Sequence, residues 1–392
     1  MTQSPTASMR DILGVTGIRS EYDIMSSVYR AIEEEETLRL RLAVTGAHLS
    51  EQFGHTVDQI RQDGFTIEEE IYSLLDTDRA VGRVIGLGGQ LRGLSQTVHR
   101  ASPDMLLVLG DREEAMATAL VGAYTNVPVA HLCGGDRVVG NVDDQVRHAV
   151  TKLAHLHLVT NEESYKRVER LGEQPHRIHN VGNPGLDRLR ETKQLSKSAL
   201  SERLGFDLPE DEPFILLIQH VISTEIDEAY DQMKTTLEAI DDLQIRTVLS
   251  YPNSDAGSRR MIDAIKEYED RLYLHTSEHI PRVEFVNLMR HASCMLGNSS
   301  AGIMESPLLG LPVINVGNRQ HGRLHAENVT FVDHDETEIR RAVKASIYDE
   351  ERRKEAQNCS NPYGDGRSSK RIARLLAETD IDDSLLVKDI TY

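Results

Sequence analysis

The chain has 392 residues, of which 27% are charged and 39% hydrophobic, a composition typical of globular proteins rather than of membrane-embedded or disordered ones. Its formal net charge of −19 disfavours nucleic acids and anionic membranes as partners, but it leaves room for a local basic site that binds an anion. This length exceeds one ordinary hydrophobic core and predicts two domains.

Cysteine usage and the N-terminus bear on the compartment. Cys133, Cys294 and Cys359 are odd in number and widely spaced, which favours a reducing environment over a disulfide framework. The sequence has no CxxC or HExxH motif, so we expect no zinc site. No stretch is long and apolar enough to span a bilayer, and MTQSPTASMR lacks the apolar core of a signal peptide. We therefore expect a cytoplasmic protein.

Hydrophobic runs typical of strands alternate with helical stretches in the first half of the chain. The first run, residues 12–17, leads to a helix near residues 24–36, and further strands are expected at 40–45, 105–109, 127–132, 156–159 and 178–181. This alternation predicts βαβ units and a parallel sheet. The series ends at the loop signal Gly182-Asn183-Pro184-Gly185, so we place an N-terminal domain at residues 1–185.

A second α/β series follows a polar, partly helical connector over residues 186–212. Its strands are expected at 214–218, 247–250, 272–275, 294–296 and 312–316, which defines a C-terminal domain over residues 186–360. Residues 361–392 begin with the turn NPYGDG and continue as a helix. The predicted fold class is α/β, with two doubly wound domains of similar size and a cleft between them.

The loop after the first strand combines Gly17, Arg19 and the start of a helix. A tight turn, free helical N–H groups and a positive charge together suit a bound phosphate. An ordinary βα loop explains these residues equally well, and the GxGxxG dinucleotide fingerprint is not present.

Two later strands of the first domain deliver carboxylates at their carboxyl ends. The strand at 105–109 is followed by Asp111, and the strand at 127–132 leads through Cys133-Gly-Gly to Asp136. In an open α/β sheet these ends line the ligand crevice, where charges are costly unless binding or chemistry uses them. Asp111 also suits the N-cap of the next helix, whereas a cap is less obvious for Asp136.

The following helix carries two pairs of charged residues spaced four apart. Asp143 and Arg147 share one helix face, and Asp144 and His148 share another. Salt-bridged decoration of the helix surface is the alternative to a functional role, and it is the better interpretation of Asp144 and His148.

In the second domain, the segment LGNSSAGIMESP passes from a strand into a helix. Asn298, Ser299 and Ser300 are good N-cap types, and the serine amides would face a diphosphate. A structural cap explains the serines equally well, but it does not explain Glu305, one to two turns into an otherwise apolar helix. We therefore favour a ligand site, in which Glu305 accepts hydrogen bonds from two ribose hydroxyls. His220 lies at the end of the strand at 214–218. A single histidine is more often structural than catalytic, but a strand end that faces the inferred cleft favours a functional role.

These motifs, in their order and spacing, resemble the UDP-N-acetylglucosamine 2-epimerases, particularly the hydrolysing branch that feeds sialic and legionaminic acid synthesis. The resemblance runs from Val15 to about Glu378. It rests on TGIRSEYD, TGAHLS, LGDREE, VPVAHLCGGD, DDQVRHAVTKLAHLH, VGNPGLD, the strand end at His220, YPNSDAG, GNSSAGIMESP, VGNRQHGR and NPYGDG.

The resemblance implies a GT-B fold, with two Rossmann-like domains, the nucleotide in the cleft and a C-terminal helix that crosses back onto the first domain. The implied catalytic residues are Asp111, Asp136, Asp143 and His220. The residues implied to bind the UDP-sugar are Arg19, Arg147, Asn298, Ser299, Ser300, Gly302, Glu305 and Arg323. No metal or redox cofactor is expected, and the family resemblance suggests a homodimer or homotetramer.

The implied reaction eliminates UDP to form a 2-acetamidoglycal and adds water, releasing N-acetylmannosamine or a related 2-acetamido sugar. The chain departs from the family pattern by having Cys-Gly-Gly-Asp136 for His-Gly-Gly-Glu, Asp143-Asp144 for Asp-Glu, and Asn-Pro-Gly-Leu-Asp187 for Ala-Leu-Gly-Leu-Asp. These departures leave the sugar specificity open. The alternatives are a non-hydrolysing epimerase that forms UDP-N-acetylmannosamine, a GT-B glycosyltransferase, and a nucleotide-sugar binder without turnover.

Overall fold

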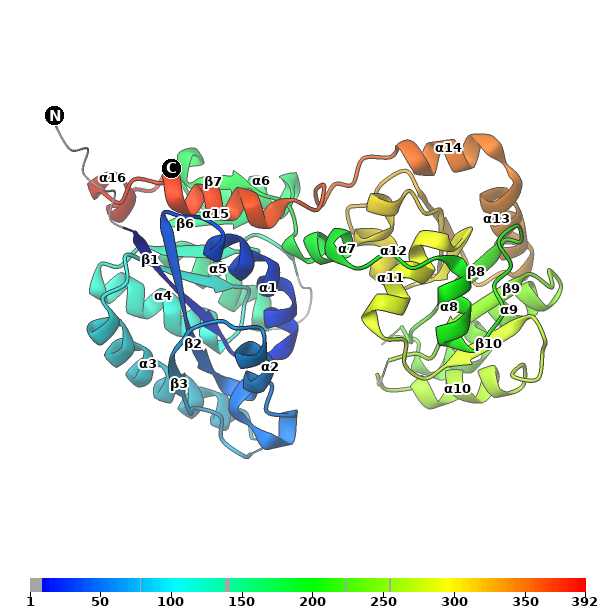
Figure 1. The fold of residues 1–392 in the computed structure, drawn as a ribbon, viewed down its shortest axis with the longest axis horizontal. Helices are drawn as coiled ribbons and strands as arrows, with labels where there is room; N and C mark the ends of the chain where they lie inside the picture. The colour runs from blue at the N-terminus through cyan, green and yellow to red at the C-terminus, as the bar shows by residue number, and fades with distance from the viewer. Residues whose placement is uncertain (1–8, 78, 138–141, 223, 254) are drawn as a thin grey trace. The chain divides into compact units, whose positions relative to one another are not determined.

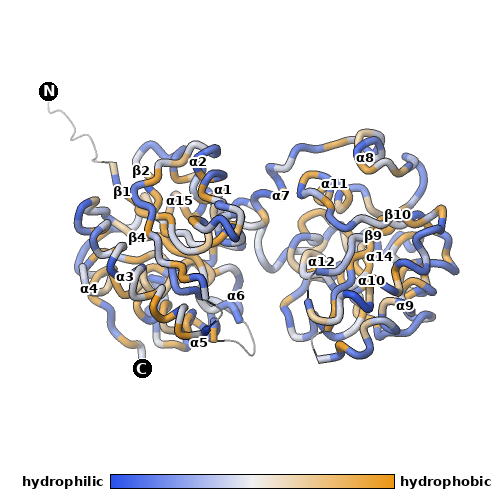
Figure 2. The backbone as a smooth tube through the Cα atoms, turned by 90° about the horizontal axis from the view of Figure 1, so that it is seen from below, coloured by the Kyte–Doolittle hydropathy of each residue, from blue (hydrophilic) through white to orange (hydrophobic). Residues whose placement is uncertain are grey.

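The computed structural model describes residues 9–392 apart from residues 78, 138–141, 223 and 254, and it divides into two compact units (Figure 1). Unit 1 comprises Met1–Arg188 and Tyr363–Tyr392, and unit 2 comprises Leu189–Pro362. Each unit is built on one parallel sheet, and in Figure 2 the hydrophobic colour is concentrated in the interior of each unit.

In the described part of unit 1, seven parallel strands form a sheet in the order β3-β2-β1-β4-β5-β6-β7. The strands are β1 (Arg10–Thr16), β2 (Leu38–Thr45), β3 (Ile67–Ile71), β4 (Met105–Leu109), β5 (Val129–Leu132), β6 (Leu156–Val159) and β7 (Ile178–Asn180). The helices of unit 1 are α1 (Arg19–Glu33), α2 (Val57–Gln62), α3 (Ala80–Ala101), α4 (Glu113–Thr125), α5 (Val142–Leu153), α6 (Glu162–Arg170), α15 (Ser368–Glu378) and α16 (Asp383–Leu386). Helix α7 (Asp187–Glu191) begins at the boundary of the two units.

Strand β4 shows why the central strands are continuous hydrophobic runs. Met105 and Leu107 pack in one hydrophobic cluster with residues of α1 and α15, whereas Leu106 and Val108 pack in another with residues of α3 and α4. Successive side chains of a strand point to opposite faces, so helices cover both faces of this sheet.

In the described part of unit 2, six parallel strands form a sheet in the order β10-β9-β8-β11-β12-β13. The strands are β8 (Phe214–Ile218), β9 (Arg246–Ser250), β10 (Leu274–Ser277), β11 (Cys294–Gly297), β12 (Val313–Val316) and β13 (Val329–Val332). The helices are α8 (Lys197–Leu204), α9 (Ala229–Asp241), α10 (Ser258–Lys266), α11 (Arg282–His291), α12 (Ala301–Met304), α13 (Glu336–Tyr348) and α14 (Glu350–Asn358).

Both sheets reverse their strand order at one position, between β1 and β4 in unit 1 and between β8 and β11 in unit 2. At such a switch point the loops at the carboxyl ends diverge and leave a crevice for a ligand. The prediction of two doubly wound, Rossmann-like sheets is therefore confirmed.

After α14 the chain returns to unit 1, where α15 packs along α1 (Figure 1). The buried carboxylate of Asp187 accepts hydrogen bonds from the backbone N–H groups of Ser368 and Ser369, at 3.0 and 2.6 Å. These N–H groups belong to the first turn of α15 and have no acceptor within the helix. A carboxylate at this end also interacts favourably with the helix dipole. Asp187 thus connects the VGNPGLD motif to the segment that follows NPYGDG.

Some expectations from the sequence were wrong. Helix α1 begins at Arg19 rather than near Ile24. Strands β3 and β13 were not predicted, because both are edge strands whose side chains are mostly half-buried, and β3 carries three consecutive glutamates. An edge strand lacks the continuous apolar run that marks a central strand.

Candidate functional site

Asp111 lies immediately after β4 and pairs with an arginine from a different element. Gly110 has φ +87°, a left-handed conformation that favours glycine and turns the chain out of the strand. The guanidinium of Arg147, on α5, donates a hydrogen bond to Oδ2 of Asp111. The helix N-cap at this position is Arg112, with no side-chain cap hydrogen bond, so the capping alternative for Asp111 was wrong.

The side chain of Arg147 is only 8% exposed. Burial, helped by the nearby Arg167, lowers the pKa of Arg147 to about 10, so the guanidinium is charged at neutral pH. Its Nε is buried and has no hydrogen-bond partner among the described residues. An ion pair with an unused donor suits a site that binds a further polar group.

Asp143 lies in the first turn of α5, four residues before Arg147. Its Oδ1 lies 4.0 Å from a guanidinium nitrogen of Arg83 on α3, and Arg83 also pairs with Glu113 at the start of α4. Asp144 lies 3.7 Å from His148, which agrees with the decorative interpretation of that pair. Helix α5 therefore brings Asp143 and Arg147 to the end of β4.

Asp136 is held by two hydroxyl groups. Thr160 and Ser164 donate hydrogen bonds to the same oxygen, Oδ1, at 2.6 and 2.7 Å. Burial raises the pKa of Asp136 despite these hydrogen bonds and the nearby Arg167. A carboxyl group that keeps its proton above the ordinary range is suited to act as a general acid. Sequence reasoning missed Thr160 and Ser164, which follow β6 and could have been found only from the strand order.

Arg19, the first residue of α1, is exposed. Its ion-pair partner among the described residues is Asp23, 3.8 Å away on the same helix. Asp23 also forms an ion pair with Arg188, at 2.8 Å. Arg19 lines a polar hollow of about 450 Å³ together with residues that include Tyr22 and His55. Within the described ranges, no hydrogen bond or ion pair joins Arg19 to the pair of Asp111 and Arg147.

Two buried glutamates lie behind these loops and were missed by the sequence analysis. Burial and the charge of Glu114 raise the pKa of Glu21 to about 8, and burial raises the pKa of Glu114. A Cβ on Gly17 would lie 2.0 Å from Oε1 of Glu114, so this glycine is required for the close approach of a carboxyl group. The signal was available in the motifs LGDREE and TGIRSE, but neither predicted that the charge of Glu114 would act on Glu21.

In unit 2, His220 and Asn298 connect the loops on either side of the switch point. The N–H of His220 donates to Oδ1 of Asn298 at 2.7 Å, and Nδ2 of Asn298 donates to the carbonyl of His220 at 2.9 Å. Arg319 and Gln320 both donate to the carbonyl of Asn298, at 3.0 and 2.8 Å. A Cβ on Gly297 would lie 2.1 Å from the carbonyl oxygen of Ile218, so only glycine allows the loops this close.

The His220 imidazole is oriented as a neutral donor. Its Nδ1 accepts a hydrogen bond from the N–H of Asn253 at 3.1 Å, which leaves the proton on Nε2. Burial, with a smaller contribution from Arg319, lowers the pKa of His220 to about 4. At neutral pH this side chain therefore offers an N–H group rather than a positive charge.

The segment that follows Asn298 differs from its predicted form. Helix α12 covers only Ala301–Met304, so Glu305 lies just after the helix rather than inside it, because Pro307 cannot donate a helical hydrogen bond. Glu305 pairs with Arg282 at 2.7 Å. Ser299 accepts from the N–H of Ala301 at 3.3 Å, whereas Ser300 makes no cap hydrogen bond.

Gly302 and Arg323 have different surroundings. Gly302 packs against Val313, and a Cβ there would lie 3.0 Å from that side chain. Arg323 is exposed in the loop after β12, and its backbone N–H donates to Gln320 at 3.2 Å. The structure thus connects His220, Asn298 and Arg319 directly, while Glu305 and Arg323 have other partners.

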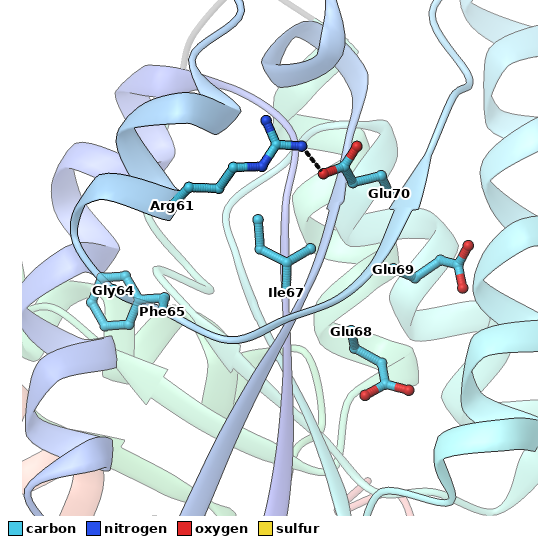
Figure 3. A pocket seen from close by; sticks show the side chains of 7 residues that line it. All are labelled: Arg61, Gly64, Phe65, Ile67, Glu68, Glu69 and Glu70. Carbon is cyan, nitrogen blue, oxygen red and sulfur yellow. Dashed lines mark hydrogen bonds and ion pairs between the residues drawn. The ribbon is translucent and has the colours of Figure 1, made fainter.

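A separate hollow of about 500 Å³ lies beside the edge strand β3 (Figure 3). It is lined by Arg61, Phe65, Ile67 and the glutamates of β3, and the Arg61 guanidinium points at Glu70, with which it forms an ion pair (Figure 3). None of the predicted site residues lines it, so it is not part of the candidate site.

Among the described residues, no cluster of three or more histidine, cysteine, aspartate or glutamate side chains is arranged to hold a metal ion. No helix in the described ranges has the length and apolar character needed to cross a membrane.

Comparison with known proteins supports the family resemblance. The sequence model described as UDP-N-acetylglucosamine 2-epimerase matches residues 30–377. The chain is 35% identical over 384 residues to a Legionella pneumophila protein named UDP-N,N'-diacetylbacillosamine 2-epimerase (hydrolyzing), covering 98% of this chain and 100% of that protein. It is 31% identical over 325 residues to a Campylobacter jejuni protein named GDP/UDP-N,N'-diacetylbacillosamine 2-epimerase (hydrolyzing), covering 82% and 84%.

Among solved structures, the UDP-GlcNAc 2-epimerase from Neisseria meningitidis bound to UDP-GlcNAc matches with a TM-score of 0.78 and 21% sequence identity. The match covers 94% of this chain and 100% of that one. This likeness confirms the predicted GT-B fold class, with its two Rossmann-like domains.

Proposed function

This chain belongs to the UDP-N-acetylglucosamine 2-epimerase family, and we propose that it is a hydrolysing member, which converts a 2-acetamido UDP-sugar into UDP and the free 2-epimeric sugar. The two relatives described above carry the word hydrolyzing in their names, and the first of them matches along its whole length. The observation that carries the proposal is the set of three carboxylates, Asp111, Asp136 and Asp143, which follow β4 and β5 and begin α5.

The chemistry requires groups of this kind. The proton on carbon 2 of the sugar is not acidic until the bond between carbon 1 and the UDP oxygen breaks and positive charge develops at carbon 1. A carboxylate then stabilises this charge and removes the proton, and the electron pair of the C–H bond forms the carbon 1–carbon 2 double bond. Water next adds its oxygen to carbon 1, while a proton adds to the opposite face of carbon 2.

We assign the proton transfers according to the surroundings of each carboxyl group. Asp136 is the acid, because burial raises its pKa. Asp111, which the Arg147 guanidinium orients, is the base that removes the proton from carbon 2. Asp143, at the start of the same helix as Arg147, directs the incoming water.

The groups in unit 2 are assigned to the departing UDP. The Nε2–H group of His220 donates to the diphosphate, and the backbone amides of Ser299 and Ser300 supply further donors. Glu305, with Arg282 beside it, accepts hydrogen bonds from the ribose hydroxyls. Arg323 contributes positive charge, as do Arg19 and Arg147 of unit 1, while Asn298 and Gly302 shape the loop that binds the nucleotide.

The test is a proton NMR time course in deuterated water with UDP-GlcNAc and, separately, UDP-N,N'-diacetylbacillosamine. We expect UDP and free sugar to accumulate in equal amounts, with deuterium at carbon 2 of the released sugar. We expect the diacetylated substrate to give the higher kcat/KM, because the 35% identical relative is named for it. A product that remains attached to UDP would instead identify a non-hydrolysing epimerase. UDP binding in calorimetry without sugar release would identify a nucleotide-sugar binder.

A further inference from the structure

We propose that Lys388, in the segment that follows α16, is a positioning residue that fixes α5 and thereby the pair formed by Asp111 and Arg147. The inference rests on the proposed function, because that function makes Asp143 and Arg147 of α5 part of the reacting site. The argument concerns unit 1 alone.

Lys388 holds the carboxyl end of α5. Its ammonium group donates to the backbone carbonyls of Lys152 and Ala154, at 2.8 and 2.5 Å, and lies 3.5 Å from that of Thr151. The last carbonyls of a helix have no partner within the helix, and a positive charge there also interacts favourably with the helix dipole. Lys388 is therefore a cap for α5 that comes from the far end of the chain.

The ammonium group is also fixed by a buried carboxylate. Glu173 lies 2.7 Å from Lys388 and 2.8 Å from Nε2 of His157, and its side chain is 1% exposed. Burial lowers the pKa of Lys388 to about 8, although Glu173 opposes this shift, so the ammonium form predominates at pH 7. Four oxygen acceptors around one ammonium leave it little freedom.

The segment that carries Lys388 is anchored without it. Arg177, which is 1% exposed, donates to the carbonyls of Ser384, Leu385 and Val387, at 2.6, 2.5 and 2.8 Å. The side chain of Leu385 lies in the hydrophobic core, and the N–H of Thr391 donates to Gly172 at 3.3 Å. Loss of the Lys388 ammonium should therefore leave the segment in place while releasing the end of α5.

A buried chain of contacts runs from α5 to the residue before Asp111. The hydroxyl of Thr151 lies 3.3 Å from Nδ1 of His131, a fully buried residue of β5. Nε2 of the same ring donates to the carbonyl of Gly110 at 2.7 Å. Lys388 and His131 thus fix Thr151 from two sides, one turn beyond Arg147.

This arrangement matters because Asp111 and Arg147 come from different elements and must meet precisely. A misplacement of about 1 Å in a reacting group can cost roughly 10²-fold in rate. Substitution of Lys388 should therefore lower kcat more than it raises KM, since Arg147 is the one assigned UDP-binding residue on α5 and the groups of unit 2 are unchanged.

The test compares Lys388→Met with Lys388→Arg and Lys152→Met. Lys152 is a matched control, because its ammonium lies 2.6 Å from the same Glu173 but its hydrogen bond goes to Leu171 rather than to a carbonyl of α5. We expect Lys388→Met to lower kcat about tenfold with KM within about twofold of wild type. Lys388→Arg should recover most of kcat, and Lys152→Met should stay within about twofold of wild type.

Hydrogen–deuterium exchange of the free proteins supplies a second measurement that needs no substrate. The amides of residues 142–153 should exchange about tenfold faster in Lys388→Met than in wild type or Lys152→Met, at unchanged far-ultraviolet circular dichroism. Wild-type kcat and exchange in Lys388→Met would overturn the inference. Equal losses in the two methionine variants would also overturn it, because the charge balance of Glu173 would then explain both.

These outcomes are separate from the failure of the proposed function. If the wild-type protein released no sugar from any UDP-sugar, the proposed function would fail, and the exchange measurement would still report whether Lys388 holds α5. If the wild type turned over and Lys388→Met matched it in kcat and in exchange, only the role of Lys388 would fail.

Discussion

The two units share the order of six strands, to which unit 1 adds β7, but they present different chemistry at the switch point of the sheet. In unit 1 the loops around β1, β4 and β5 carry carboxyl groups, and the pKa values of Glu21, Glu114 and Asp136 are raised by burial. In unit 2 the corresponding loops after β8 and β11 carry a neutral imidazole and an amide, His220 and Asn298, close to Arg319.

This difference shows how one scaffold can serve two tasks. Buried carboxyl groups with displaced pKa values suit proton transfer, whereas neutral donors and an arginine suit an anion that must be held and released. Function therefore depends on the residues at the strand ends rather than on the sheet that positions them. The comparison predicts that changes to the carboxyl groups of unit 1 affect turnover and that changes to the loops after β8 and β11 affect nucleotide affinity.

The largest effect is expected for Asp111→Asn in unit 1. An amide cannot accept the proton from carbon 2, so kcat should fall about 10²- to 10⁴-fold, while the Kd for UDP in calorimetry stays within about threefold. Glu69→Gln is the matched control. Glu69 also accepts a hydrogen bond from an arginine, Arg100, but it lies on the edge strand β3, so this change should leave kcat unaltered. If Asp111→Asn also lost UDP affinity, the assignment of proton transfer to unit 1 and of UDP binding to unit 2 would be contradicted.

A smaller effect is expected for Asn298→Ala in unit 2. This change removes both side-chain hydrogen bonds to the backbone of His220, each worth about 1 kcal/mol, so the UDP affinity should fall about tenfold. The value of kcat at saturating substrate should change less than the affinity. Asn358→Ala, on the exposed side of α14, should leave both quantities unchanged. An unchanged Kd for UDP with a lower kcat would contradict the comparison.

The smallest effect is expected for Glu21→Gln, and it concerns stability. The pKa of Glu21 is raised from 4.5 to about 8, so the folded state keeps a proton that the unfolded chain loses as the pH rises through this window. The wild-type protein is therefore increasingly destabilised between about pH 4.5 and pH 8, and glutamine, which has no charge, avoids this cost.

Thermal or urea unfolding measures this change. Glu21→Gln should raise the free energy of unfolding by about 1–2 kcal/mol at pH 8, and by less at pH 5. Glu202→Gln, an exposed change on α8, should show no such pH dependence. A gain of equal size at both pH values would show that packing, rather than the buried charge, causes the difference.

Much of the fold could be predicted from local sequence. The strand at 105–109 was located to the residue, because five consecutive apolar side chains are buried on both faces of a central strand. The same signal was weak for β3, where edge glutamates interrupt the pattern. Asp111 and Asp136 were identified for a related reason, because a charged residue soon after an apolar strand is easily recognised in the sequence.

The partners of those residues could not be predicted. Helical spacing placed Arg147 beside Asp143, yet its hydrogen bond goes to Asp111, 36 residues away. Glu305 was expected inside a helix, but it lies beyond the end of α12 and pairs with Arg282. Neither pairing has a signature in the local sequence, because each joins two separate elements.

By itself, the sequence determined the α/β class, the positions of the central strands, the candidate residues at the strand ends and the resemblance to a family. Each of these follows from short-range properties, namely apolar runs, loop signals and the spacing of motifs. Only the tertiary structure decided that Glu114 interacts electrostatically with Glu21, that Asp136 accepts hydrogen bonds from Thr160 and Ser164, and that Lys388 caps α5. These contacts depend on which strands lie side by side and on where the chain returns, and that arrangement follows from the packing of the whole unit.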